Sequence, residues 1–380
     1  MLTSSEVKAL ALECGFELAG VARAEPLAES RYYHEWVEDG FAGKMTYLTD
    51  RRADVRDDPR RLLASAQSII CVGKLYNSPQ AYAADRDEGE LSAISRYAWG
   101  EDYHDVLRAG LERLVERMSE RASFEWKICV DTAPLLERAY ARHAGLGWIG
   151  KNTCLIDQQK GSWFFLGELL VSLALEPDAP PPDRCGTCTR CIEACPTTAI
   201  VPARQPDGPA FTIDSRLCIA YFTIELRGPI PEEARADIGG HVFGCDICQD
   251  VCPWNGRAPL TADPAFAPDR VMPPLEKLAA MSEEEFRVMF RGSPVKRARY
   301  TGFLRNVAIA MGNLKREKFR EPLERMVEST DEVVAEHARW ALEQLATELV
   351  RRDSTIRSTE DAVSIGTGAQ AFDSDPARHD

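Results

Sequence analysis

Eight of the twelve cysteines of this chain lie between residues 185 and 252, and their spacing restricts the possible folds of that segment more tightly than any other pattern. The first four follow C-x2-C-x2-C-x3-C-P, the ligand run of bacterial 4Fe–4S ferredoxins. Two-residue gaps allow three thiolates to surround one cubane, whereas the longer gap and the proline direct the fourth thiolate towards a second cluster. This first set consists of Cys185, Cys188, Cys191 and Cys195.

The other four cysteines repeat the motif, with its first member moved upstream by 26 intervening residues. In two-cluster ferredoxins, the last cysteine of each run binds the cluster of the other run. The sequence therefore predicts two 4Fe–4S clusters with exchanged ligands. One is held by Cys185, Cys188, Cys191 and Cys252, and the other by Cys195, Cys218, Cys245 and Cys248.

Zinc and disulfides are the alternative uses of so many cysteines. Zinc sites favour Cys and His pairs separated by a long spacer, and disulfides need an oxidising compartment, so neither matches this pattern. The remaining cysteines stand in apolar segments and are expected to be inert, buried thiols. They are Cys14, Cys71, Cys129 and Cys154.

Length and composition indicate an ordinary globular protein of two or three domains. The first twenty residues predict an amphipathic helix with acidic residues rather than a signal peptide, and no apolar run approaches the ~18 residues of a membrane helix. We therefore expect a cytoplasmic protein. The formal net charge of −14 disfavours general affinity for nucleic acid but leaves room for a local basic patch.

The pattern of elements predicts an α+β protein of several domains. Residues 1–176 alternate helical and strand-like segments and indicate an α/β domain. Paired strands after Asn152 suggest a mixed sheet. A proline-rich linker opens the two-cluster module, expected at 177–257, and helical hairpins of HEAT-like character are expected at 258–350. Residues 351–380 lack periodicity and predict a disordered tail.

Residues 145–150 read G-L-G-W-I-G, which matches the dinucleotide-binding pattern letter for letter. A phosphate-binding loop must leave a strand and open a helix. Here a helical pattern precedes the glycines and strand-like segments follow, so a nucleotide fold is disfavoured. The cobalamin signature D-x-H-x-x-G begins at Asp102 and His104 but has Leu107 in place of its glycine. Histidine ligation of cobalt through that motif is therefore unsupported.

Motifs along the first 350 residues resemble the epoxyqueuosine reductase family of tRNA modification enzymes. The shared features include both cysteine sets and several short segments. These segments are M-T-Y-L (45–48), D-P-R-R-L-L (58–63), S-R-Y-A-W-G-E-D-Y-H (95–104), V-D-T-A-P-L-L-E-R (130–138), G-L-G-W-I-G-K-N-T (145–153), G-S-W-F-F-L-G-E (161–168) and S-P-V-K-R (293–297).

The resemblance implies a nitroreductase-like domain that binds cobalamin, a ferredoxin-like module, and HEAT-like helices that help to hold tRNA. It implies removal of the epoxide oxygen from epoxyqueuosine at the wobble position of a tRNA anticodon stem-loop, with two electrons and two protons consumed. Cob(I)alamin, reduced again by the clusters, is the implied reductant. A flavodoxin or ferredoxin is the expected electron donor, and a monomer is the expected state.

The resemblance also transfers roles to individual residues. Asp131 is the implied proton donor, since a carboxyl group covered by corrin and substrate favours its protonated form; its alternative role is a helix N-cap. Candidate cobalamin contacts, in addition to Asp131, are Arg56, Tyr97, Lys151, Asn152, Thr153 and Tyr221, and His104 is a further candidate lining the site. A basic stretch without acids, residues 291–305, predicts phosphate contacts by Lys296, Arg297, Arg299 and Arg305.

Two other functions stay open from the sequence. Another corrinoid reductase, such as a reductive dehalogenase, shares cobalamin and paired clusters, although such enzymes usually carry a twin-arginine export signal that is absent here. A non-catalytic electron-transfer protein would also carry two clusters, but the large α/β domain with Asp131 argues against it.

Overall fold

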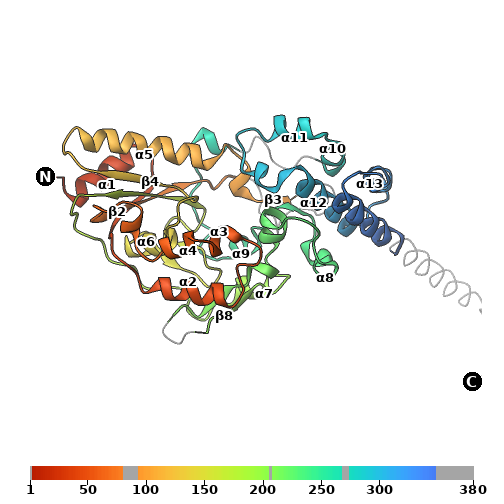
Figure 1. Ribbon diagram of the computed structural model, residues 1–380, viewed down its shortest axis with the longest axis horizontal. Helices are drawn as coiled ribbons and strands as arrows, with labels where there is room; N and C mark the ends of the chain where they lie inside the picture. The colour runs from red at the N-terminus through yellow and green to blue at the C-terminus, as the bar shows by residue number, and fades with distance from the viewer. Residues whose placement is uncertain (1, 80–92, 205–207, 268–273, 348–380) are drawn as a thin grey trace, which may run out of the picture.

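The computed structural model describes residues 2–79, 93–204, 208–267 and 274–347 (Figure 1). The predicted tail at 351–380 lies outside these residues. Within them, no helix has the length and apolar character needed to cross a lipid bilayer.

A four-stranded sheet forms the centre of the N-terminal half, in the order β1 (Leu18–Arg23), β2 (Ser68–Leu75), β7 (Phe164–Val171), β4 (Trp126–Cys129). All eight residues of β2 are buried, which explains its continuous apolar run. Each neighbouring pair is antiparallel. The expected mixed sheet is therefore wrong, since β7 enters the centre of the sheet antiparallel to both of its neighbours, β2 and β4.

Helices cover both faces of this sheet. On one face, α1 (Ser4–Glu13) and α5 (Tyr103–Ser119) share a core with β2 and β7. On the other face, α6 (Glu137–His143) packs in a second core. The helices α2 (Glu29–Glu38), α3 (Thr46–Thr49) and α4 (Arg52–Val55) lie between β1 and β2 in the chain.

The segment G-L-G-W-I-G-K-N-T leaves α6 and enters a small hairpin of β5 (Trp148–Ile149) and β6 (Leu155–Ile156). A helix followed by strands is the reverse of a phosphate-binding loop, so this glycine pattern lacks the topology of the dinucleotide motif.

The cysteine module contains only short elements, namely α7 (Arg190–Glu193), β8 (Ile200–Pro202), β9 (Phe211–Ile213), α8 (Glu232–Arg235), β10 (His241–Phe243) and α9 (Ile247–Asp250). One turn of π-helix, Tyr221–Glu225, begins three residues after Cys218. Strand β10 pairs in parallel with β3 (Ala93–Ile94), which joins this module to the N-terminal half.

The C-terminal region is helical and lies at the opposite end of the molecule from α1 (Figure 1). It comprises α10 (Leu275–Ala279), α11 (Glu283–Met289), α12 (Arg299–Leu314), α13 (Arg320–Val327) and a last helix at 332–347. Most of α12 is buried, because it packs against α10, α13 and β10. Its core includes β3 and residues 219–243, so the helices dock directly on the cysteine module.

Candidate active site

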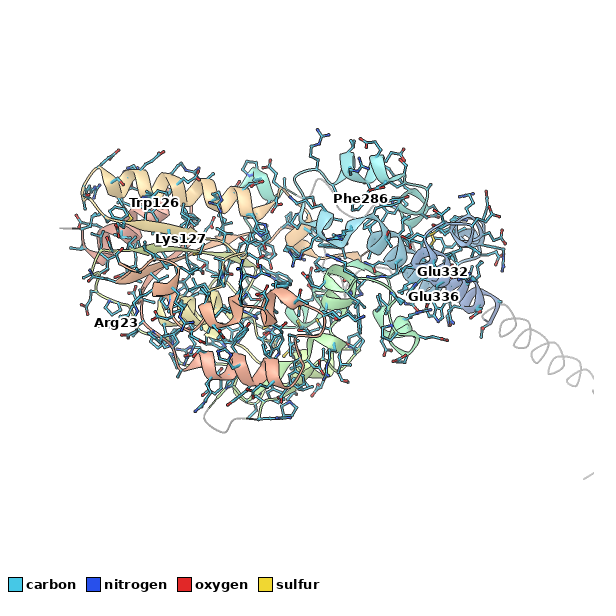
Figure 2. All side chains as sticks on the ribbon, viewed as in Figure 1. Arg23, Trp126, Lys127, Phe286, Glu332 and Glu336 are labelled. Atoms are coloured by element: carbon cyan, nitrogen blue, oxygen red, sulfur yellow. The ribbon has the colours of Figure 1, made fainter. Side chains whose placement is uncertain are left out.

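Asp131 stands on a turn between β4 and α6. Strand β4 is an edge strand that starts with the exposed Trp126 and Lys127 (Figure 2) and ends in the buried pair Ile128 and Cys129. Asp131 has φ 53°, a left-handed conformation that costs free energy for a residue with a Cβ. Its side chain is 51% exposed. The fold therefore presents this carboxylate at the surface, on a residue whose backbone conformation is strained.

The start of α6 corrects one sequence interpretation. The segment from Thr132 to Leu136 precedes the helix, whose N-cap is Leu136, and Pro134 lies outside its first turn. Asp131 is therefore not the N-cap of α6. Its main-chain N–H instead donates to Oε1 of Glu137 at 2.5 Å, which fixes the turn from the helix side.

His104, in the first turn of α5, connects Asp131 to a second carboxylate. Its Nε2 lies 3.2 Å from Oδ2 of Asp131, and its Nδ1 lies 2.7 Å from Oδ1 of Asp102. The other oxygen of Asp102 accepts a hydrogen bond from Nζ of Lys296 at 2.7 Å. Both ring nitrogens of His104 are thus occupied, so this histidine is not free to bind a metal.

These contacts set where the proton resides. Burial lowers the pKa of His104, but its hydrogen bonds to Asp102 and Asp131 outweigh burial and raise the pKa to about 9. Burial raises the pKa of Asp131, but the hydrogen bond from His104 and the charge of Arg297 bring it below its ordinary value. In the free protein these shifts favour the shared proton on His104. The expectation that Asp131 is protonated applies to a site covered by corrin and substrate and stays a prediction.

Aromatic rings surround this pair. Tyr103 stacks on His104 with ring centroids 4.2 Å apart and on Phe165 at 4.4 Å. Tyr97 meets Tyr103 edge-on at 6.2 Å. Burial, reinforced by the charge of Asp131, raises the pKa of both tyrosines. They therefore stay neutral beside the carboxylate.

Two arginines predicted to bind ligands have protein partners. Arg56 is buried, donates to the carbonyl oxygen of Arg52 at 2.9 Å, and lies 5.4 Å from the ring centre of Tyr33. Arg297 donates to both carboxylate oxygens of Glu225, at 2.5 and 2.9 Å. Arg297 contributes a positive charge near Asp131 without contacting it.

Tyr221 links the cysteine module to the N-terminal half. Its ring is buried, and its hydroxyl accepts a hydrogen bond from the main-chain N–H of Lys44 at 3.0 Å. A Cβ atom on Gly43 would lie 2.7 Å from that hydroxyl, so the close approach requires glycine. Tyr221 also opens the π-helix after Cys218, and such turns are frequent at functional sites.

The tripeptide after the glycines faces the cysteine module. Nζ of Lys151 donates to the carbonyl oxygens of Gly186 and Cys188, and Nδ2 of Asn152 donates to that of Cys248. The polar ends of Lys151 and Asn152 therefore brace the cysteine loops. Thr153, at φ 61°, accepts from Nη1 of Arg138 through its carbonyl and hydroxyl oxygens.

Two of the thiols have neighbours from the sets that the crossover rule predicts, while the full assignment stays a prediction. Burial, with the neighbouring thiols of Cys252, Cys185 and Cys188, raises the pKa of Cys191 to about 11. Burial, with the thiols of Cys218 and Cys195, raises the pKa of Cys245. All eight thiols are free, and within the described ranges no three His, Cys, Asp or Glu side chains are close enough to hold a single metal ion. Two sets of thiols spaced around larger groups fit two cubanes better than zinc.

The predicted phosphate contacts differ in exposure. Lys296, Arg297 and Arg299 are all exposed, but Lys296 and Arg297 are paired with acids, whereas Arg299 stands at the start of α12. Arg305 is 1% exposed and donates to the carbonyl oxygens of Phe222, Leu226 and Gly228. The prediction that Arg305 contacts phosphate is corrected: this guanidinium caps the π-helix from within the core.

Sequence reasoning missed two carboxyl groups next to this site. Glu137 holds the main chain of Asp131, and Glu168 lies fully buried in the centre of β7. The available signal was an acidic residue inside the apolar run Phe164–Val171, because a lone carboxylate is costly to bury in a sheet.

Comparisons with known proteins match this geometry to one family. A family model described as a 4Fe–4S double cluster binding domain covers residues 184–255, and one described as Epoxyqueuosine reductase QueG, DUF1730 covers residues 56–132. The epoxyqueuosine reductase of Xanthomonas campestris is 40% identical over 348 residues, which are 90% of this chain and 96% of the relative.

Two solved structures share the fold. An epoxyqueuosine reductase crystallised with an epoxyqueuosine-modified tRNA-Tyr stem loop superposes with a TM-score of 0.81 at 29% identity, over 90% of this chain and 89% of that one. The epoxyqueuosine reductase from Bacillus subtilis, solved with an aspartate catalytic loop swung out of the active site, gives a TM-score of 0.79 at 28% identity, over 90% of each chain.

Proposed function

Because this chain belongs to the epoxyqueuosine reductase family, we propose that it reduces epoxyqueuosine to queuosine at the wobble position of tRNA, with Asp131 as the group that protonates the epoxide oxygen. The observation that carries this proposal is the half-exposed Asp131 carboxylate, held on a left-handed turn and hydrogen-bonded to His104. The relative with the displaced aspartate loop supports an equivalent role for residues 130–136.

The reaction balances with two electrons and two protons. Both C–O bonds of the epoxide break, a carbon–carbon double bond forms, and the oxygen leaves as water. Negative charge develops on oxygen when the first C–O bond breaks, so an acid must deliver a proton there. We propose that the proton stored on His104 passes to Asp131 as substrate covers the site, since lost solvation favours the neutral carboxyl group.

The proposed cofactors are two 4Fe–4S clusters and cobalamin. The clusters would bind at the two thiol sets. Once bound, they would carry single electrons towards the site. Cobalamin would supply a strongly reducing cobalt centre when bound. The residues we propose to hold it are Arg56, Tyr97, Thr153 and Tyr221, with Asp131 on the substrate side; Lys151 and Asn152 would support it by fixing the cluster loops.

Turnover assays on the native chain test this proposal. Protein loaded with iron, sulfide and cobalamin, and reduced without oxygen, is expected to convert epoxyqueuosine-tRNA to queuosine-tRNA, as read by nucleoside mass spectrometry. Omission of cobalamin or of reductant should abolish the product. Equal product without cobalamin would refute the corrinoid role.

The pH dependence of turnover reports the proton on His104. The pKa of His104 is raised to about 9, so the proton is present at neutral pH and is lost as pH rises through that value. We expect kcat to fall above pH ~9 in the native enzyme. His104→Gln keeps a hydrogen bond to Asp131 but stores no proton, so its kcat should be lower at neutral pH and should lack this limb. An unchanged limb in the variant would place the titrating group elsewhere.

Arg299 is the cleanest test of the proposed tRNA contact on the helical region, because among the described residues it has no acidic partner. Arg299→Glu should weaken tRNA binding and flatten its salt dependence by about one phosphate contact. Arg121→Glu, at the far end of α5, makes the same charge change and should leave binding intact. Equal effects from both variants would mean that the change in net charge, and not a phosphate contact of Arg299, weakens tRNA binding.

A further inference from the structure

Glu168 is a buried acid that the reaction described above does not use. It lies in the middle of the central strand β7, opposite Cys71 of β2 and Cys129 of β4, and it is 0% exposed. Strand alternation places it on the same face as Leu166 and Leu170. These neighbours belong to the apolar core beneath α6, so the carboxyl group sits where a leucine would be expected.

The protein offers Glu168 no ordinary hydrogen-bond donor. Within the described residues, no amide, hydroxyl or amine donates to either of its oxygens. Helix α6 packs on β7, and the carboxyl of Glu137 in its first turn is close enough to Glu168 for each acid to affect the pKa of the other. Burial raises the pKa of both acids; the charge of Asp131 adds to burial at Glu137, and the charge of Glu137 adds to it at Glu168. Two carboxyl groups in such contact avoid repulsion only when a proton lies between them.

Glu137 connects this buried pair to the proposed active site. Its Oε1 accepts the main-chain N–H of Asp131 at 2.5 Å, while the Asp131 side chain points outwards to His104. The strained φ of 53° at Asp131 is therefore held from two sides, by Glu137 through the backbone and by His104 through the side chain. A strained turn persists only when its surroundings determine it in this way.

We propose that Glu137 and Glu168 share one proton and act as positioning residues that hold Asp131 in its left-handed conformation, facing the substrate. This inference rests on the proposed function for the role of Asp131. The contact of the Glu137–Glu168 pair with the Asp131 amide, called the latch below, is a property of the free protein. Glu168 donates the shared proton to Glu137, and the charge left on Glu137 holds the Asp131 amide. When the proton is lost, the two carboxylates repel and the turn is released.

Two substitutions at Glu168 distinguish a role as hydrogen-bond donor to Glu137 from a role in core packing alone. Glu168→Gln keeps the size and provides a permanent N–H donor to Glu137. Glu168→Leu matches the neighbouring Leu166 and Leu170 but removes the donor. Hydrogen exchange is measured by mass spectrometry on the folded protein, with peptides that start several residues before Asp131 and cover residues 130–136, so that the Asp131 amide is included. We expect lost protection in the Leu variant and native protection in the Gln variant.

Kinetics on the same proteins give a second readout. In Glu168→Leu, kcat should fall on the order of 100-fold with little change in KM, because a misplaced acid slows the chemical step and leaves tRNA binding intact. Glu168→Gln should restore kcat. If the exchange results hold while the native protein shows no epoxyqueuosine reduction, the proposed function fails and the latch stands.

Three outcomes would overturn the latch. The first is native protection at residues 130–136 in Glu168→Leu, and the second is equal loss in the Gln and Leu variants. If the Leu variant also loses protection in β2 and β7, its sheet is damaged, and Glu137→Ala on the part-exposed start of α6 decides instead. That variant should lose protection only around Asp131; native protection there would be the third contradicting outcome.

Discussion

Asp131→Asn is expected to lose turnover by ~10²–10⁴-fold while retaining both clusters and cobalamin, because the amide keeps the shape of the carboxyl group but cannot deliver a proton. Its oxygen can still accept the hydrogen bond from His104, and its main-chain N–H can still bind Glu137, so the turn should persist. Anaerobic single-turnover rates, measured with pre-reduced protein and epoxyqueuosine-tRNA, separate this effect from electron supply.

Asp105→Asn provides a matched control for that variant. Asp105 is an exposed acid in the first turn of α5, close to His104 in sequence but outside the hydrogen-bonded chain from Asp131 to Lys296. Its replacement removes the same charge and should leave turnover near the native rate. Near-native turnover in Asp131→Asn would remove Asp131 from the reaction and leave the proton source unassigned.

Loss of one cluster should have the second large effect. Cys218→Ala removes a ligand from the set that contains Cys195, Cys245 and Cys248, so iron and sulfide should fall from about eight to about four of each per chain. Turnover with an external electron donor should be nearly abolished, because electrons would have no path from the other cluster past Tyr221. Cys14→Ala changes a thiol outside both sets and should preserve metal content.

Double variants test how the eight ligands are divided. Cys218→Ala with Cys195→Ala removes two ligands of one predicted cluster and should lose no more iron than either change alone. Cys218→Ala with Cys252→Ala removes one ligand from each and should lose nearly all iron. If the first pair loses all the iron and the second only half, the exchanged-ligand assignment is wrong.

Regular patterns made much of this structure predictable. The cysteine spacing predicted the two-cluster domain that a family model matches at residues 184–255, because short ligand loops encode their geometry locally. Hydrophobic patterns indicated a helix within the first twenty residues, where α1 lies, and alternating helices and strands over residues 1–176. The local role of Asp131 was less predictable, since this residue lies on a turn before α6 and binds Glu137 through its main chain instead of capping the helix.

The candidate site was less predictable because its contacts are distant in sequence. Lys296 reaches Asp102 across 194 residues, and no periodicity links them. Arg305 looked like part of a basic surface, but the fold turned it inwards to satisfy carbonyl groups of the π-helix. The buried partnership of Glu137 with Glu168 likewise appears only when β7 takes its central place in the sheet.

The measurement that bears most directly on the whole account is a single turnover without external reductant. Protein loaded with iron, sulfide and cobalamin is reduced, separated from its reductant under anaerobic conditions, and mixed with epoxyqueuosine-tRNA. We predict about one queuosine for every two stored electrons, since two one-electron clusters match the two electrons of the reaction. Clusters that stay reduced while epoxyqueuosine remains unchanged would contradict electron transfer from the cysteine module to the substrate site beside Asp131.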